Sequence, residues 1–220
     1  MEELNCETVF TIPIFGGIGV SESVVVTWII MAVLVLISVL ATRNLKVTNP
    51  GKGQMLLEMA VSSLHDMVSD MVGEHGQRYV PYLMTVLIYI GFANIIGLFG
   101  FKPPTKDLNV TIALAVMSIV LIEAAGIIAR GTKGWIKSFA QPVAIMTPFN
   151  ILEIVIKPLS LCMRLFGNVL GAFVIMELIK QVVPVILPVP FSLYFDIFDG
   201  LIQAYVFVFL TSLFIKEAIE

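Results

Sequence analysis

The stretch LSLCMRLFGN, residues 159–168, places Arg164 inside a long apolar tract. About 15 apolar-rich residues precede the arginine in this tract, and nearly 20 follow it. An arginine side chain keeps its charge at every physiological pH. At the centre of a bilayer such a charge costs about 2.5–3.5 kcal/mol on insertion scales. A charge kept there indicates a function. The alternatives are that Arg164 snorkels to a helix end, or that it pairs with another group of the same chain.

The composition indicates a membrane protein that crosses the bilayer several times. The chain has 220 residues, of which 58% are hydrophobic and 13% charged, whereas soluble domains have about 25% charged residues. Its mean hydropathy is +0.98. Several tracts reach the roughly 20 apolar residues that cross a bilayer core of ~30 Å. The net charge is −3 and there is no basic block, so we expect the lipid bilayer as a partner and no nucleic acid.

We expect one all-α membrane domain over residues 1–220, with five transmembrane helices and one amphipathic interfacial helix. The expected segments are an outer N-terminal segment 1–23, spans at 24–43, 79–101 and 108–130, an interfacial helix at 53–73, and two final tracts at 149–183 and 190–216. As helices, these tracts would measure roughly 52 and 40 Å. Because the core is only ~30 Å thick, we expect them to be long, steeply tilted helices. Pro158 could bend the first of them.

The interfacial helix is expected to lie on a surface, and because its polar face is acidic we expect it to face protein or water rather than anionic lipid. Its apolar positions recur at helical spacing, and its polar positions share the opposite face. The apolar set is Leu56, Ala60, Leu64, Met67 and Met71, and the polar set is Glu58, Ser62, His65, Asp66, Ser69 and Asp70.

The basic residues predict the orientation, because cytoplasmic segments carry more Lys and Arg. One set of span ends holds Arg43, Lys46, Lys52, Arg78, Arg130, Lys133, Lys137 and Lys216, and the other set holds Lys102, Lys106 and Lys180. We expect the larger set inside the cell. The N-terminus would then be outside and the C-terminus cytoplasmic.

Polar residues mark candidate ion paths on the last two tracts. Lys157, Ser160, Arg164, Gly167, Asn168 and Gly171 form one polar, small-residue stripe, and its glycines allow another helix to approach closely. Asp196, Asp199 and Gln203 follow the spacing i, i+3, i+7 and share one face of an α-helix. They predict a hydrated path open to the outside. The alternative for the two aspartates is an exposed helix start, where carboxylates favour the helix dipole.

Three further residues extend these paths. Glu177 could join the outer path, while Glu153 and Asn150 could line a second path toward the cytoplasm. Glu123, in the third span, is expected to reach the inner surface or to pair with a basic residue. His65 and His75 have no Cys or His neighbours at metal-ligand spacing. The sequence also contains no phosphate loop, nucleophile elbow or zinc motif. We therefore expect no metal, no cofactor and no nucleotide site.

Three stretches together resemble one family. KPLSLCMRLFGNVLGA, residues 157–172, closely resembles the arginine-bearing helix of the a subunit of rotary (F-type) ATP synthases. PTKDLNVTIALA, 104–115, resembles the segment that enters the fourth helix of that family, and GLIQAYVFVFLTSLFI, 200–215, resembles its final helix. The resemblance extends over most of the chain from about residue 20.

The resemblance implies a role for each matching residue. Arg164 matches the essential arginine that faces the ion-binding carboxylate of the rotating c-ring, and Asn168 and Gln203 match polar residues near it. Asp107 matches an acidic residue at the outer mouth, and Asp196 falls where the family often has an ionisable group. The chain departs from the family at Phe173, where many members have Glu or His. Glu177, one turn later, could compensate.

The resemblance predicts a stator subunit that forms two ion half-channels against the c-ring. Arg164 would separate the half-channels and promote deprotonation of the ring carboxylate. The chain would not itself form ATP, and its partners would be the c-ring, the peripheral-stalk b subunits and the rest of the synthase, in a bacterial plasma membrane. A free-standing secondary transporter or channel is the alternative, though the sequence shows no paired half-repeats. A purely structural scaffold would leave Arg164 and Gln203 without a reason. The choice of H⁺ or Na⁺, the ring size and the working direction stay open.

Overall fold

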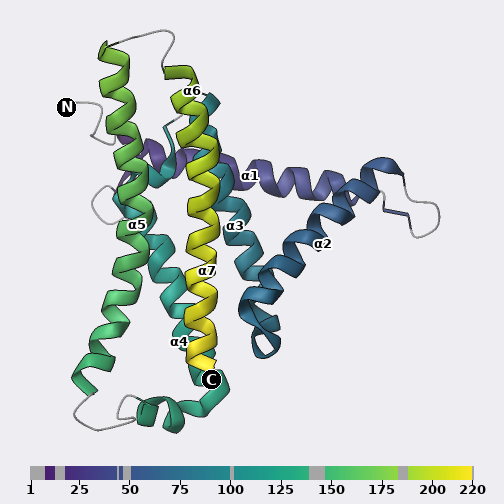
Figure 1. Cartoon of the computed structure of the whole chain (residues 1–220), viewed down its shortest axis with the longest axis vertical. Coiled ribbons are helices and arrows are strands. Elements are labelled where there is room, and N and C mark those ends of the chain that lie inside the picture. Colours follow the sequence, from purple (N-terminus) through teal and green to yellow (C-terminus); the bar gives the residue numbers. More distant parts are fainter. Residues whose placement is uncertain are drawn as a thin grey trace.

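Long helices packed side by side form a bundle, and one further helix crosses it (Figure 1). The computed structural model describes residues 8–12, 18–43, 45–46, 51–99, 102–138, 147–182 and 188–219. Among these residues, five helices are long and apolar enough to cross a membrane. The expected all-α membrane class is confirmed. Parts of the expected segments lie outside the described residues, namely residues 1–7 and 13–17 of the outer N-terminal segment, 100–101 of the second span and 183 of the first long tract.

The N-terminal segment contains a short hairpin that the sequence analysis did not predict. β1 (Thr8–Ile12) pairs with β2 (Ile18–Ser21) in an antiparallel two-stranded sheet. The β1 sequence TVFTI consists of β-branched and aromatic residues, which favour strands. The hairpin leads directly into the first helix.

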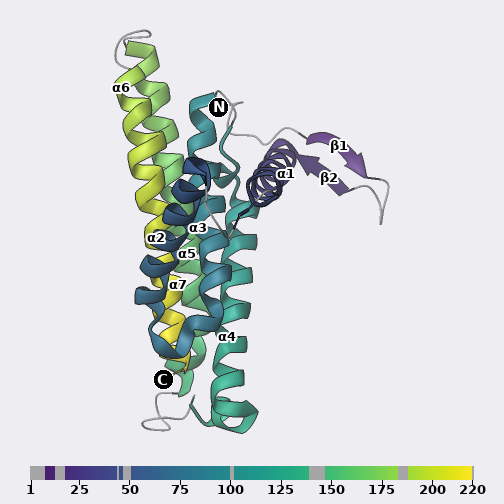
Figure 2. The same cartoon turned by 90° about the vertical axis from the view of Figure 1, so that its right-hand side faces the viewer.

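Helix α1 (Glu22–Thr42) crosses the bundle at a large angle. In Figure 2 it is seen end-on while the other long helices run vertically. Its first half is fixed by Ser21, which donates a hydrogen bond to Asp107 (3.1 Å), and by Glu22, which pairs with Lys102 (3.1 Å). Its second half is mostly exposed. Because α1 and the bundle point in such different directions, they cannot both stand upright in one bilayer.

Helix α2 (Lys52–Val72) is amphipathic, and only its second half packs on the bundle. Val68 and Val72 are buried against α3 and α7, whereas Leu56 is 71% exposed. The acidic face is exposed. Gly73 then takes a positive φ of 79°, which turns the chain into the next helix.

The core of the bundle lies where α3 (Val80–Ile95), α4 (Leu108–Ser138) and α7 (Gly200–Ile219) meet. Its largest fully buried side chains are Leu83, Ile90, Ile122, Phe207 and Ile215. A 3₁₀ turn at Ile96–Phe99 extends α3, and another at Pro104–Lys106 precedes α4. Within α4, Gly131 has φ 71° and ψ 160°, so the helix breaks there and the residues up to Ser138 take a new direction.

The last two helical columns stand next to each other (Figure 1). Helix α5 (Thr147–Val182) has 36 residues and continues through Pro158, for a length of about 54 Å. The other column consists of α6 (Pro188–Ser192), a π-helical segment (Leu193–Asp199) and α7. A π-helix has one more residue in each hydrogen-bonded turn than an α-helix, and such segments often occur at functional sites.

Candidate functional site

Arg164 lies near the middle of α5 on a face that the chain leaves uncovered. Its side chain is exposed, as are those of Leu159 and Met163. A Cβ built on Gly167 or Gly171 would meet no atom within 4 Å. Within the described part of the chain, no hydrogen bond or ion pair reaches the Arg164 guanidinium, so the alternative of pairing within the chain has no support there. A charge on such a face calls for an external partner, because isolated charges in a bilayer are unfavourable.

Asn168 and Gln203 meet one helical turn from Arg164. Asn168 Nδ2 on α5 donates a hydrogen bond of 2.6 Å to Gln203 Oε1 on α7. Gln203 is 3% exposed, and its Nε2 has no hydrogen-bond partner among the described residues. The structure therefore brings together two of the residues that the sequence analysis selected, and leaves one buried amide donor available.

A cavity of about 450 Å³ lies between α5, the π-helical segment, α7 and the α3–α4 connection. It brings together four of the predicted outer-path residues. These are Glu177, Asp196, Asp199 and Gln203. The spacing argument for Asp196 and Asp199 assumed an α-helix, but both lie in the π-helical segment. Despite this difference in helix type, both aspartates line the same cavity as Gln203.

The cavity also contains three lysines that the sequence analysis did not assign to a path: Lys102, Lys106 and Lys180. Lys180 pairs with Glu177 at 2.9 Å, and this i, i+3 spacing could have been noticed in the sequence. Lys106 Nζ lies 3.2 Å from the centroid of the Phe173 ring. No sequence signal joins these two residues, because they come from different elements.

The π-helical segment is held against α3 by close contacts. Asn94 Nδ2 donates a hydrogen bond of 3.0 Å to the Gly200 carbonyl, and Thr105 Oγ1 donates one of 2.8 Å to Asn94 Oδ1. A Cβ on Gly200 would lie 2.8 Å from Asn94 Cβ, and one on Gly97 would lie 3.2 Å from Asp196 Oδ1. Gly97 thus allows close approach to the Asp196 carboxylate, and Gly200 allows close approach of α7 to Asn94 of α3.

Asp107 lies outside the lining of this cavity and has a visible local role. It is 3% exposed and accepts hydrogen bonds from Ser21 Oγ (3.1 Å) and from the backbone N–H of Asn109 (3.0 Å). The second bond caps the start of α4. Asp107 thus connects α1 to α4 and follows Lys106, which does line the cavity.

The residues of the predicted inner path lie toward the other end of α5. Glu153 pairs with Lys157 (3.4 Å), and Lys157 also pairs with Glu217 of α7 (3.1 Å). Arg130 Nη2 donates a hydrogen bond of 3.0 Å to the Glu217 carbonyl. Asn150 is half-buried. Glu217 was missed in the sequence, since its position near the C-terminus gave no sign of a contact with α5.

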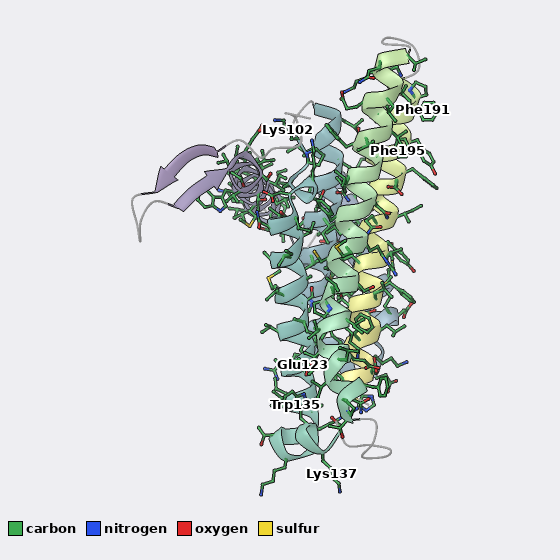
Figure 3. All side chains as sticks on the ribbon, turned by 90° about the vertical axis from the view of Figure 1, so that its left-hand side faces the viewer. Lys102, Glu123, Trp135, Lys137, Phe191 and Phe195 are labelled. Carbon is green, nitrogen blue, oxygen red and sulfur yellow. The ribbon has the colours of Figure 1, made fainter. Side chains whose placement is uncertain are left out.

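Glu123 has an aromatic partner rather than the basic one that was considered. Trp135 Nε1 donates a hydrogen bond of 2.8 Å to Glu123 Oε2. The break at Gly131 changes the direction of the last part of α4, so that Trp135 reaches Glu123 in the part before the break. Figure 3 shows Glu123, Trp135 and Lys137 toward one end of the bundle, and Lys102, Phe191 and Phe195 toward the other. Among the described residues, no group of His, Cys, Asp and Glu suits a metal ion.

Comparison with known proteins gives one consistent family. The model of the ATP synthase A chain matches residues 24–216. An ATP synthase subunit a from Moorella thermoacetica is 38% identical over 206 residues, covering 93% of this chain and 94% of the relative. A subunit a from Pelobacter propionicus is 38% identical over 205 residues, covering 91% and 88%. A sodium-ion-specific subunit a from Propionigenium modestum is 31% identical over 219 residues, covering 92% and 75%. The chain therefore belongs to the ATP synthase A chain family, the a subunits of the membrane sector of F-type ATP synthase.

Proposed function

We propose that this chain is the stator subunit that forms two ion half-channels against a rotating c-ring, with Arg164 between them. The observation that carries this proposal is the placement of Arg164. Its guanidinium lies on an uncovered face of α5, one turn from the Asn168–Gln203 pair. A ring carboxylate that passes this face would meet a fixed positive charge.

In the proposed outer half-channel, the ion enters the cavity and moves toward Gln203. Glu177, Asp196 and Asp199 line the route and can relay protons. Gln203 also lines this cavity, accepts the hydrogen bond from Asn168, and has no partner for its Nε2 among the described residues. Asp107 supports the mouth by fixing the start of α4 beside Lys106.

In the proposed inner half-channel, Glu153 and Asn150 receive the ion toward the cytoplasm. Glu153 is exposed and shares Lys157 with Glu217. On α5, Lys157 lies about two helical turns from Arg164 and Glu153 about three. Arg164 thus stands between the two proposed routes along the helix.

Arg164 acts by electrostatics. An opposite charge within ~4–6 Å favours the ionised form of a carboxylate, so the ring carboxylate releases its ion as it meets the guanidinium. The same charge prevents direct flow between the half-channels. Each elementary charge that crosses the membrane contributes about 2.3 kcal/mol per 100 mV. Rotation of the ring conveys this energy to the subunits that form ATP.

The a subunit works with the rest of the ATP synthase, and we propose the c-ring and the peripheral-stalk b subunits as its direct partners. The chain is a multi-pass membrane protein. We place it in a bacterial plasma membrane, with the N-terminus outside and the C-terminus cytoplasmic. Lys137, from the larger set of basic residues, and Lys102, from the smaller set, lie at opposite ends of the bundle (Figure 3). This agrees with the two sets facing opposite sides of the membrane.

Arg164→Ala tests the proposal. In reconstituted vesicles that contain the whole complex, we expect gradient-driven ATP synthesis to be abolished, and Arg164→Lys to retain little, because lysine can lose its proton when desolvated. Both complexes should still assemble, since the Arg164 side chain is exposed and no hydrogen bond or ion pair reaches it within the described residues. Near-normal synthesis by an assembled Arg164→Ala complex would refute the role. A free-standing transporter would instead carry its ion without any copurifying ring.

A further inference from the structure

The last residues of α4, 132–138, form a short helical shelf that leaves the direction of the preceding helix. Gly131, with φ 71° and ψ 160°, makes this break. Trp135 attaches the shelf to the helix before the break. Its Nε1 donates a hydrogen bond of 2.8 Å to Glu123 Oε2, and a Cβ built on Gly126 would lie 3.4 Å from its Cδ1. The shelf therefore has a defined position relative to the span that precedes it.

Two lysines lie on the side of the shelf opposite to Trp135. Lys133 and Lys137 are one helical turn apart and share a face, whereas Trp135, midway between them in sequence, points the other way. Both lysines are exposed, and neither makes an ion pair or a hydrogen bond within the described residues. Figure 3 shows Lys137 extending away from the end of the bundle. The two ammonium groups thus face outward, from positions about 6 Å apart along the helix.

The neighbouring acidic residues leave the charge of the shelf in place. Glu153 and Glu217, near the same end of the bundle, already share Lys157, at 3.4 and 3.1 Å. In the sequence, the whole connection 131–146 contains no Asp or Glu. The shelf therefore presents two positive charges that call for an anionic partner from outside the chain.

The setting of the shelf favours a lipid surface as that partner. Trp135 is the last residue of a segment apolar enough to cross a membrane, and tryptophan is enriched where membrane and water meet. The sequence after the shelf, FAQPVAIM at 139–146, contains one polar residue. Lysines at this level are attracted by anionic headgroups, and their long stems can lie along apolar surface. The acidic face of α2 offers no such attraction.

We propose that Lys133 and Lys137 form a binding site for the phosphate headgroup of an anionic phospholipid. Side chains one turn apart on a helix are neighbours, so both ammonium groups can approach the oxygens of one phosphate. The hydrogen bond from Trp135 to Glu123 keeps the two lysines turned away from the bundle. A bound lipid fixes the depth of this end of α4 in the membrane. The site is independent of the proposed ion path.

Photoactivatable lipids test the site in the assembled complex, placed in nanodiscs of phosphatidylcholine. One sample contains a phosphatidylglycerol probe with its photoreactive group close to the glycerol, and a second contains an equal fraction of the matching phosphatidylcholine probe. The measured quantity is the ratio of anionic to zwitterionic probe cross-linked to the fragment that contains residues 132–138. We expect the anionic probe to be preferred. Lys133→Gln combined with Lys137→Gln should lower the ratio by about tenfold or more, because two charges beside the headgroups are removed.

Two further variants and one change of solution serve as controls. Lys46→Gln with Lys52→Gln removes two exposed lysines around the start of α2 and should change the ratio at the shelf by less than about twofold. Lys133→Arg with Lys137→Arg keeps both charges and should retain the preference. Raising the ionic strength from about 50 mM to about 500 mM needs no variant and should lower the ratio several-fold through screening.

Equal labelling by the two probes in the unmodified complex overturns the site, as does a ratio that the double glutamine variant leaves unchanged. A ratio that high salt does not alter overturns it as well. If the double glutamine variant instead loses a subunit of the complex while the lipid ratio stays the same, the two lysines belong to a protein partner. None of these measurements needs ATP synthesis, so the site can fail while the role of Arg164 stands, and the reverse also holds.

Discussion

Asn168 of α5 donates a side-chain hydrogen bond of 2.6 Å to Gln203 of α7, although the two residues are 35 positions apart in the chain. Arg164 precedes Asn168 by one turn on α5. Together with the Lys157–Glu217 pair, the bond constrains the rotation of the arginine-bearing helix relative to α7. It also turns the Gln203 amide nitrogen away from Asn168, where it has no partner among the described residues.

Removing either amide should weaken coupled synthesis for the same reason. Gln203→Leu leaves the Asn168 amide without its acceptor, and Asn168→Leu leaves a buried glutamine unpaired; such losses cost about 1–3 kcal/mol. We expect each variant to reduce gradient-driven ATP synthesis by about tenfold or more. Because one bond connects the two residues, the double variant should lose little more activity than the single variant with the lower activity. Gln181→Leu, at an exposed site near the end of α5, is the control. Multiplicative losses in the double variant would argue against a shared role.

The carboxylates of the cavity should share the work of the outer path. Asp196→Asn alone should slow ion flow in part, and adding Glu177→Gln should slow it much further, because both side chains line one cavity and Lys180 holds Glu177 in place. The rate of ATP-driven ion pumping into vesicles measures the effect, with assembly checked in parallel. Glu58→Gln, on the exposed face of α2, controls for a lost carboxylate. If Glu177→Gln changes nothing, singly or in combination, Glu177 does not compensate for Phe173.

Gly200→Ala should disturb the junction between the π-helical segment and α7. The new Cβ would stand 2.8 Å from Asn94 Cβ, so Asn94 must move and its hydrogen bond to the Gly200 carbonyl would lengthen. We expect a loss of about 1–3 kcal/mol in the free energy of unfolding, seen as a lower midpoint for thermal unfolding of the purified complex. Gly53→Ala, with nothing within 4 Å of its Cβ, should not lower the midpoint. Equal midpoints for Gly200→Ala and the unmodified complex would show that α3 yields easily at this site.

The proposed orientation can be tested on intact cells with a membrane-impermeant thiol reagent. We expect Cys6 to react, because the basic residues place the N-terminus outside. A Lys216→Cys variant, at an exposed site near the end of α7, should react only after the membrane is opened. Cys162, which is buried, should stay unlabelled in both conditions and acts as an internal control. Labelling of Lys216→Cys on intact cells would reverse the orientation.

The sequence alone determined the membrane class, because long apolar tracts have few structures open to them in a bilayer other than helices. It also selected Arg164, Asn168 and Gln203, since a charge and two amides stand out within tracts of this kind. Helical spacing placed Asp196 and Asp199 beside Gln203, and they share its cavity even though a π-helical segment replaces the assumed α-helix. Periodicity is a local property, and it could be read without the fold.

Only the tertiary structure decided which groups from distant segments meet. The contact of Lys106 with Phe173, the Glu217–Lys157 pair and the bond from Trp135 to Glu123 all depend on how the helices pack. The crossing of α1 and the capping role of Asp107 depend on the path of the connections. In each case the partner is chosen by packing between elements, and the spacing of residues along one helix carries no information about that choice.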